Sequence, residues 1–233
     1  MRTPPRRLPI RTPPFPNETL RSYIQRVAIA NHLPPEELQD YLRDPVTRRT
    51  AVVPERLAAV SGWPLSTLQH ALPELPNPGP HGPRAPGPWP QHPASAQDRD
   101  PQVACRSCAA ARGATTTVTC WAPAHGAVCV KHRRWLGHRE VLQQGSKGQV
   151  DLTRLPDVVA AAHRHRHLAR RYGLRPVWLA YNEIGLHIAL RWTQRREFGR
   201  HRNRRLEILG FDPRQWRFGP GSRHDRVCVM LRC

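Results

Sequence analysis

Two short motifs containing cysteine and histidine constrain the fold of this chain more than any other feature. Cys105 and Cys108 form a C-x2-C pair, and after twenty further residues Cys129 and His132 form a C-x2-H pair. Each pair has the spacing that turns both of its side chains towards one point. The set of three thiolates and one imidazole therefore predicts a closed, tetrahedral zinc site. Binding of the metal would contribute to folding, because the unfolded chain contains no such site. The alternative is four ordinary buried or reactive side chains.

The remaining cysteines do not indicate a secreted, disulfide-stabilised protein. The N-terminal segment MRTPPRRLPIRTPPFP lacks the apolar core of a signal peptide. No stretch approaches the roughly 18 uninterrupted apolar residues of a membrane span. We therefore expect a reducing, cytoplasmic setting and no membrane partner. Cys120, inside the zinc loop, is expected to pack, with replacement of a ligand as the alternative. Cys228 and Cys233 lack a convincing ligand spacing.

The charge of the chain is strongly positive and unevenly distributed. The net charge is +20, and residues 133–233 contain 22 basic residues against eight acidic ones. Residues 1–104 are nearly balanced, with twelve arginines against nine acids. A field of this kind attracts polyanions, of which nucleic acid is the usual example. The preference for arginine over lysine is also typical of GC-rich coding sequences, but such a bias does not explain the shortage of acids.

Apolar periodicity predicts short helices in the N-terminal part. Asn17 is the expected N-cap of a first helix, with Glu18 in its first turn and an end near Asn31. Pro34 and Pro35 open a second short helix. The apolar stripe of the first helix consists of Leu20, Tyr23, Ile24, Val27 and Ala28.

Residues 54–72 predict two helices joined by a turn at Gly62, which resembles a helix-turn-helix. In a DNA-binding protein the second of these helices would enter a major groove. It offers a base edge only polar, uncharged or histidine side chains: Ser66, Thr67, Gln69 and His70. A helical hairpin used only for packing is the alternative, because charge is missing where contact with phosphate would need it.

The C-terminal part predicts basic helices. One helix should begin at Pro156 and end at Gly173, with an apolar side formed by Val158, Val159, Ala162, Leu168 and Tyr172. A further helix is expected over residues 183–198. Arginines along such helices suit contact with phosphates. The predicted nucleic-acid-binding residues are Arg133, Arg134, Arg164, Arg166, Arg170, Arg171, Arg195, Arg196, Arg200, Arg202, Arg204 and Arg205.

These observations predict a mainly α fold with a small zinc-binding module. We expect an N-terminal helical, HTH-like region over residues 1–75 and a proline-rich linker over residues 76–104. The zinc knuckle module should occupy residues 105–150, and the arginine-rich helical region residues 151–233. The linker is expected to be semi-rigid, because it is rich in proline and has no apolar period.

Three stretches together resemble the TniQ family, the target-selection proteins of transposons related to the TnsD type. The segment LPIRTPPFPNETLRSYIQRVAIANHL is similar to the family's proline-rich lead, followed by E-x-L-x-S and R-x-A-x-x-N. The segments CRSC and VCVKHRRWL are similar to its C-x-x-C…W…C-x-x-H-x-x-x-L pattern, and LPDVVAAAHRHRHLARRYG is similar to its basic helical tail. The resemblance covers most of residues 8 to 172. The first motif is carried by Glu18, Leu20, Ser22, Arg26, Ala28 and Asn31.

The chain departs from the family pattern in two ways. Many members have a proline after the first cysteine of each knuckle, where this chain has Arg106 and Val130. Many also carry a further C-x-x-C after the histidine, which binds a second metal. None follows His132 at a suitable distance, so we expect one structural zinc ion. The chain is also short for a protein of the TnsD type.

The resemblance implies a non-catalytic accessory protein of DNA transposition. Such an adaptor would bind double-stranded DNA in the nucleoid and recruit the AAA+ ATPase (TnsC-like) of the transposition machinery. A transposase or a target-recognition complex is a further candidate partner. One alternative is a zinc-containing HTH transcriptional regulator. A minor alternative is a nuclease that uses histidine and zinc, suggested by His201, Arg202 and Asn203.

Overall fold

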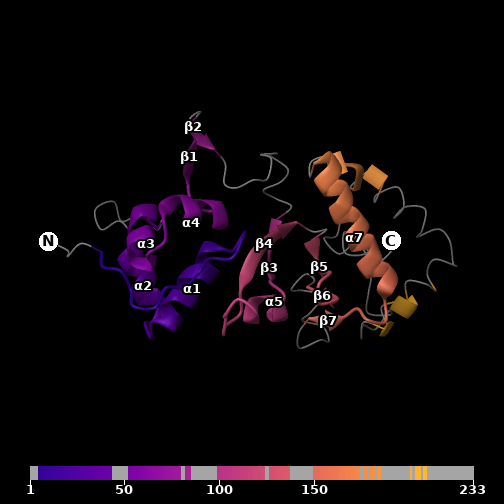
Figure 1. Ribbon diagram of the computed structural model, residues 1–233, viewed down its shortest axis with the longest axis horizontal. Helices are drawn as coiled ribbons and strands as arrows, with labels where there is room; N and C mark the ends of the chain where they lie inside the picture. Colours follow the sequence, from indigo (N-terminus) through magenta and orange to yellow (C-terminus); the bar gives the residue numbers. More distant parts are fainter. Residues whose placement is uncertain are drawn as a thin grey trace. The chain divides into compact units, whose positions relative to one another are not determined.

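The computed structural model describes most of the N-terminal and central parts of the chain and selected residues near the C-terminus. The described residues are 5–43, 52–79, 82–84, 99–123, 126–136, 149–173, 176–177, 179–181, 183–184, 200, 203–205 and 207–208. Helices and a few short strands alternate along this part of the chain (Figure 1). No described helix has both the length and the apolar content needed to span a membrane.

The chain forms two compact units whose boundaries do not follow a single cut in the sequence. The first unit contains residues 1–91 together with residues 109–121. The second contains residues 92–108 and 122–233. The loop between the two knuckles therefore belongs, for most of its length, to the N-terminal helical unit.

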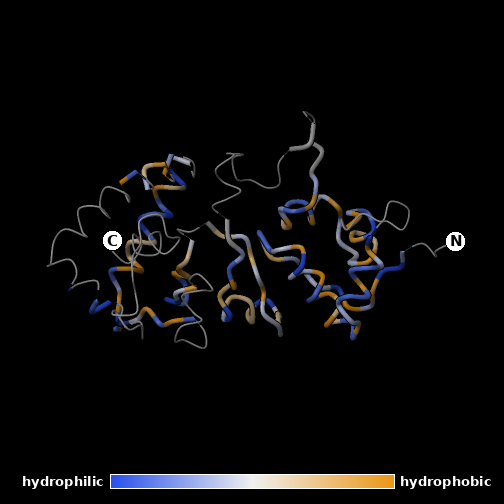
Figure 2. The backbone as a smooth tube through the Cα atoms, turned by 180° about the vertical axis from the view of Figure 1, so that it is seen from behind, coloured by the Kyte–Doolittle hydropathy of each residue, from blue (hydrophilic) through white to orange (hydrophobic). Residues whose placement is uncertain are grey.

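Four helices build the first unit: α1 (Leu20–Ala30), α2 (Pro35–Leu42), α3 (Pro54–Ser61) and α4 (Leu65–Ala71). Polar and apolar residues are interleaved along them (Figure 2), and their apolar sides meet in one core. Tyr23, Leu42, Leu57 and Leu68 are fully buried there. The helices predicted from Leu20, from Pro34–Pro35 and within residues 54–72 are thus confirmed.

The start of α1 differs from the prediction. Thr19, rather than Asn17, is the N-cap, and its Oγ1 accepts a hydrogen bond of 3.2 Å from the Ser22 backbone N–H. Asn17 has a positive φ of 58°, and Glu18 is fully buried in an isolated bridge with Cys120. Glu18 therefore does not interact mainly with the helix dipole. Its carboxylate accepts hydrogen bonds from Ser22 and Arg26, which lie about one and two turns further along the chain.

Helices α3 and α4 occupy the positions predicted for the helix pair. Gly62 ends α3 in the left-handed region with φ 70°, and its N–H bonds to the carbonyl of Ala58. An alanine Cβ at Gly62 would lie 2.5 Å from Nε of Arg7. The arrangement suits a compact hairpin of helices, and a role of α4 in DNA reading remains a prediction.

Short strands lie inside the segment predicted to be a linker. Strands β1 (Asn77–Gly79) and β2 (Gly82–Arg84) pair as an antiparallel hairpin, with Pro78 opposite Pro83. Strand β3 (Arg99–Val103) follows. Strand β4 (Thr119–Pro123) comes later, between the knuckles. The sequence did not predict this hairpin, because its strands are rich in proline, and prolines are usually confined to the edges and turns of sheets.

The second unit combines a small sheet with one long helix. Strands β5 (Val128–Cys129), β6 (Arg134–Trp135) and β7 (Val150–Asp151) form an antiparallel sheet in that order. Helix α7 (Pro156–Tyr172) begins at the predicted proline, and Gly173 is its C-cap. Trp135, Leu152, Leu155 and Val158 are buried in a shared core.

One prediction for the C-terminal part has a different outcome, and others fall outside the described residues. Leu168 and Tyr172 of α7 are exposed by 43% and 56%, so the apolar side of this helix covers only its first half. Of the helix expected over 183–198, only residues 183–184 are described. Cys228 and Cys233 also lie outside the described residues.

Candidate metal centre and basic surface

The four predicted metal ligands lie together in the second unit. One ligand atom from each of Cys105, Cys108, Cys129 and His132 lies within 4.8 Å of the other three. Nδ1 of His132 is 3.4 Å from Sγ of Cys105, 3.2 Å from that of Cys108 and 3.7 Å from that of Cys129. The sulfurs of Cys108 and Cys129 are 3.7 Å apart.

These distances fit a tetrahedral metal ion. Zinc bonds of about 2.3 Å to sulfur and about 2.0 Å to nitrogen place two sulfurs about 3.8 Å apart, and sulfur and nitrogen about 3.5 Å apart. A disulfide would need sulfurs about 2.05 Å apart, and the described cysteines form none. The three cysteine side chains would repel each other as thiolates unless a cation lay between them. The arrangement with the His132 imidazole therefore suits a bound cation. The residues can hold a metal ion, consistent with zinc.

Local structure explains how each knuckle presents its ligands. The first knuckle leads into helix α5 (Arg106–Ala110), and Gln149 holds its backbone. The Gln149 side chain accepts a 3.0 Å hydrogen bond from the Arg106 N–H and donates one of 2.6 Å to the Ala104 carbonyl. The second knuckle is the turn between β5 and β6, where Arg133 has a φ of 49°. The first knuckle is therefore held by the Gln149 side chain, and the second by the pairing of β5 with β6.

Trp135 and Trp121, the two tryptophans that flank the second knuckle in the sequence, have different environments. Trp135 pairs with Val128 across β5 and β6 and is only 1% exposed, in the core beside the knuckle. Trp121 is half-buried and belongs to the first unit, where its backbone N–H donates a hydrogen bond of 2.7 Å to the Asn17 carbonyl. Trp135 thus packs beside the second knuckle, whereas Trp121 supports the start of α1.

Cys120 is separate from the ligand group and lies in the first unit. Burial, and secondarily the negative charge of Glu18, raise the pKa of the Cys120 thiol to about 12. The thiol is therefore shielded from water, and it lies outside the group of four residues that could hold a metal ion. This environment favours the predicted packing role over replacement of a ligand.

The residues of the E-x-L-x-S and R-x-A-x-x-N motifs form a buried polar network in the first unit. The fully buried Glu18 carboxylate accepts hydrogen bonds from Nε and Nη2 of Arg26, both at 2.8 Å. It also accepts bonds from Ser22 Oγ at 2.9 Å and from the Phe15 N–H at 3.0 Å. Arg26 in addition donates to the Pro13 carbonyl at 2.7 Å. Buried charges of this kind are tolerated only when paired in this way.

Asn31 extends this network to the start of the proline-rich lead. Its amide oxygen accepts from the Ile10 N–H at 2.8 Å, and its Nδ2 donates to the Ile10 carbonyl at 3.0 Å. Ser22 Oγ accepts from the Thr119 N–H at 3.0 Å, so the same network reaches strand β4. The motif is therefore architectural, since it fastens a segment without regular structure to helix α1.

Sequence reasoning missed the role of residues 109–121 in this unit. The Thr19 N–H bonds to the Thr119 carbonyl at 2.9 Å, which joins the start of α1 to this segment. The run from Thr115 to Trp121 is rich in β-branched residues, which are typical of strands. That signal is present in the sequence, within the segment predicted to be the zinc loop.

The predicted nucleic-acid-binding arginines fall into three groups. Those described as exposed are Arg133, Arg164, Arg166, Arg170, Arg171, Arg200 and Arg204. Arg134 and Arg205 are half-buried, and Arg205 forms an ion pair with Asp157. Arg166 also donates to the Val128 carbonyl at 2.8 Å. Arg195, Arg196 and Arg202 lie outside the described residues.

Helix α7 therefore presents its charge in its second half. From His163 to Tyr172 every residue is exposed except the half-buried His165 and Ala169. Burial, and secondarily the charge of Arg166, lower the pKa of His165, so this side chain is neutral at neutral pH. The arginines of this face carry positive charge at neutral pH, whereas His165 does not.

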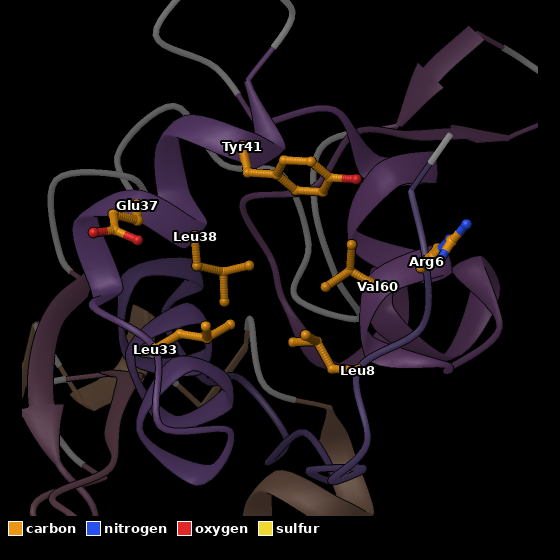
Figure 3. Close-up of a pocket in the computed structure, with 7 residues that line it drawn as sticks. All are labelled: Arg6, Leu8, Leu33, Glu37, Leu38, Tyr41 and Val60. Carbon is orange, nitrogen blue, oxygen red and sulfur yellow. The ribbon is translucent and has the colours of Figure 1, made fainter. Parts of the chain in front are cut away.

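An apolar pocket of about 570 Å³ opens on the first unit (Figure 3). Leu8, Leu33, Leu38 and Val60 line it together with Tyr41, and Arg6 and Glu37 stand at opposite sides. It offers apolar contacts rather than a set of groups for acid–base or metal chemistry. The basic features of the chain lie elsewhere.

Comparison with known protein families gives one result. The model of the TniQ family matches residues 9–136, which include the lead, helices α1 to α4, and all four residues that could hold a metal ion. Comparisons with curated proteins and with solved structures give no significant match. The matched span covers more than half of the chain. The chain therefore belongs to the TniQ family, and with it to the accessory proteins associated with transposition.

Proposed function

We propose that this chain is a non-catalytic target-selection adaptor, which binds double-stranded DNA through exposed arginines and recruits a TnsC-like AAA+ ATPase. The observation that carries the DNA-binding part is the exposed basic half of α7. Arg164, Arg170 and Arg171 project there, and no acidic residue follows Asp157 within the helix. Arginines on an exposed helix contact phosphates without reading sequence.

The adaptor role also rests on what the sequence lacks. The chain contains no Walker A motif for ATP, and its acids are scattered rather than grouped as in a two-metal strand-transfer site. ATP-dependent and strand-transfer steps would then belong to partners. The metal centre, which uses four protein ligands, would be a closed structural zinc site and would leave no open position for a substrate.

DNA binding is tested by fluorescence anisotropy of the full-length, zinc-loaded protein with several unrelated duplexes. We expect similar affinities for all of them and a steep loss of affinity with salt. Replacing Arg164, Arg170 and Arg171 by alanine should reduce the log–log salt slope by about 3, since each lost phosphate contact removes about one unit. The matched control replaces the same three residues by lysine, which keeps the charge.

Two outcomes would contradict the proposal. A strong preference for one duplex sequence, with protection of that site in a footprint, would favour the transcriptional regulator. Equal salt slopes for the alanine and lysine variants would remove α7 from the interface. Recruitment is tested separately, by co-purification of the zinc-loaded protein with a purified TnsC-like ATPase in the presence and absence of DNA.

A further inference from the structure

A small basic pocket lies in the first unit, away from the arginines predicted from the sequence. It has a volume of about 140 Å³ and lies between the proline-rich lead, helix α1 and the loop after α5. No aspartate or glutamate lines it. We call it the basic notch and define it by Arg11, Thr12, Arg26, Arg112, Thr115 and Thr116.

The charge of the basic notch comes from two arginines. Arg26 is neutralised by Glu18 in the buried ion pair. Arg11 and Arg112 are exposed, and among the described residues neither forms an ion pair. Two positive charges therefore face a pocket without a counter-charge from the lining residues.

Both arginines are held in place by aromatic rings. The guanidinium carbon of Arg11 lies 3.7 Å from the centre of the Trp63 ring, and that of Arg112 lies 5.4 Å from the centre of the Phe15 ring. Contacts of this kind stabilise a cation without using its N–H donors. The donors remain available to a ligand, and less side-chain entropy is lost when they bind one.

The hydroxyl of Thr12, which lines the basic notch, has no hydrogen-bond partner among the described residues. Thr12 is only 8% exposed. Buried hydroxyls are normally paired, so such an atom indicates a missing partner. Thr115 and Thr116 add two more hydroxyls to the lining. The N–H groups of arginine guanidiniums and the hydroxyls of threonine are donors that proteins commonly use to bind phosphate oxygens.

We propose that the basic notch binds a backbone phosphate of double-stranded DNA. The volume is well below the roughly 300 Å³ at which pockets for drug-sized ligands begin, so it suits a single small anion rather than a base. This inference rests on the proposed DNA binding, and it adds a contact on the first unit to the surface of α7. Such a contact would position the DNA without reading its sequence.

The test compares Arg112→Ala with Arg21→Ala in the full-length, zinc-loaded protein. Arg21 is an exposed arginine of α1 that does not line the notch, and it lies roughly 140° around the helix from Arg26. We expect Arg112→Ala to lower the affinity for a duplex about 3- to 10-fold and the salt slope by about 1. Arg21→Ala should change the salt slope by much less.

A second measurement examines the pocket without DNA. Inorganic phosphate should shift the amide NMR resonances of Gly113, Thr115 and Thr116 in the unaltered protein, and this shift should be lost in Arg112→Ala. Thr12→Val should weaken DNA binding without lowering the free energy of unfolding, because its hydroxyl has no partner to lose.

Each contrary outcome is distinguishable. If the protein binds DNA and responds to substitution in α7, but Arg112→Ala and Arg21→Ala give equal slopes, the notch is not a DNA contact and the proposed function stands. If phosphate shifts the amides while the DNA slope is unchanged, the notch is a site for free phosphate and our assignment is wrong. If the protein binds no duplex, the proposed function fails first, and the DNA assignment of the notch fails with it.

Discussion

Removal of one partner of the Glu18–Arg26 pair should be among the most destabilising single changes in the first unit. Arg26→Met keeps most of the side-chain volume and removes the guanidinium. The Glu18 carboxylate is fully buried and Arg26 is 5% exposed, so water cannot replace the lost partner without opening the structure. After the change, Glu18 retains only the Ser22 hydroxyl and the Phe15 N–H as donors.

The expected magnitude follows from this burial. Breaking a buried ion pair from one side typically costs 3–5 kcal/mol, since an uncompensated charge stays behind. Glu18→Gln should cost about 3 kcal/mol as well, because the amide group would place its N–H2 against donors of Arg26, Ser22 or Phe15. The double variant should cost less than the sum of the two, because neither charge is then left alone. A coupling of about 1–3 kcal/mol is expected.

The assay is urea unfolding of the four proteins of this double-mutant cycle, followed by circular dichroism with zinc present. Asp40→Asn is the matched control, because Asp40 and Arg43 form a surface pair at 2.5 Å in the same unit. Exposed pairs are worth about 0.2–1 kcal/mol. Single changes at Glu18 and Arg26 that cost no more than this control, or that add without coupling, would refute the reasoning.

Three further predictions follow from the structure. The purified protein should contain one equivalent of zinc by mass spectrometry of the metal; Cys129→Ser should lose the zinc and unfold the second unit, whereas Cys120→Ser should retain it. The contribution of Cys120 to the free energy of unfolding should be constant from neutral pH to about 9 and should fall as the pH rises towards 12, because burial raises the pKa of the Cys120 thiol from 9.0 to about 12 and the unfolded state then loses its proton first. The difference in urea midpoint between the unaltered protein and Cys120→Ala at increasing pH measures this, and a difference that does not change with pH would contradict it. Gly62→Ala should cost about 1–2 kcal/mol, since residue 62 has a left-handed φ of 70°; an unchanged thermal midpoint would show that this turn relaxes freely.

Short-range sequence patterns predicted those features that depend on residues close together in the chain. The knuckle spacing predicted which four residues lie together, and Pro156 and Gly173 marked both ends of α7. The apolar recurrence of residues 20–28 identified the buried side of α1. Each of these signals depends on residues a few positions apart, which a single sequence displays directly.

Features that depend on distant partners were missed for the same reason. Glu18 was expected to favour the helix dipole, but its charge is used by Arg26, and its backbone pairs with Cys120 about a hundred residues away. The ion pair of Arg205 with Asp157, 48 residues earlier, also has no local signal. The basic notch joins residues near positions 11 and 112, and no local period reveals such a pair.

The interrupted first unit has a consequence for how this protein can be divided. Thr119 exchanges hydrogen bonds with Thr19 and Ser22 at the start of α1, and the Trp121 N–H donates to the Asn17 carbonyl just before it. The chain reaches Thr119 and Trp121 only after it has passed Cys105 and Cys108. A fragment that stops at residue 91 would leave the Ser22 hydroxyl and the Thr19 N–H without these partners. Recombination or truncation between the helices and the metal-binding motifs would therefore damage the N-terminal unit itself. The smallest segment that keeps this unit intact must contain both the helices and the metal-binding motifs, as the matched residues 9–136 do.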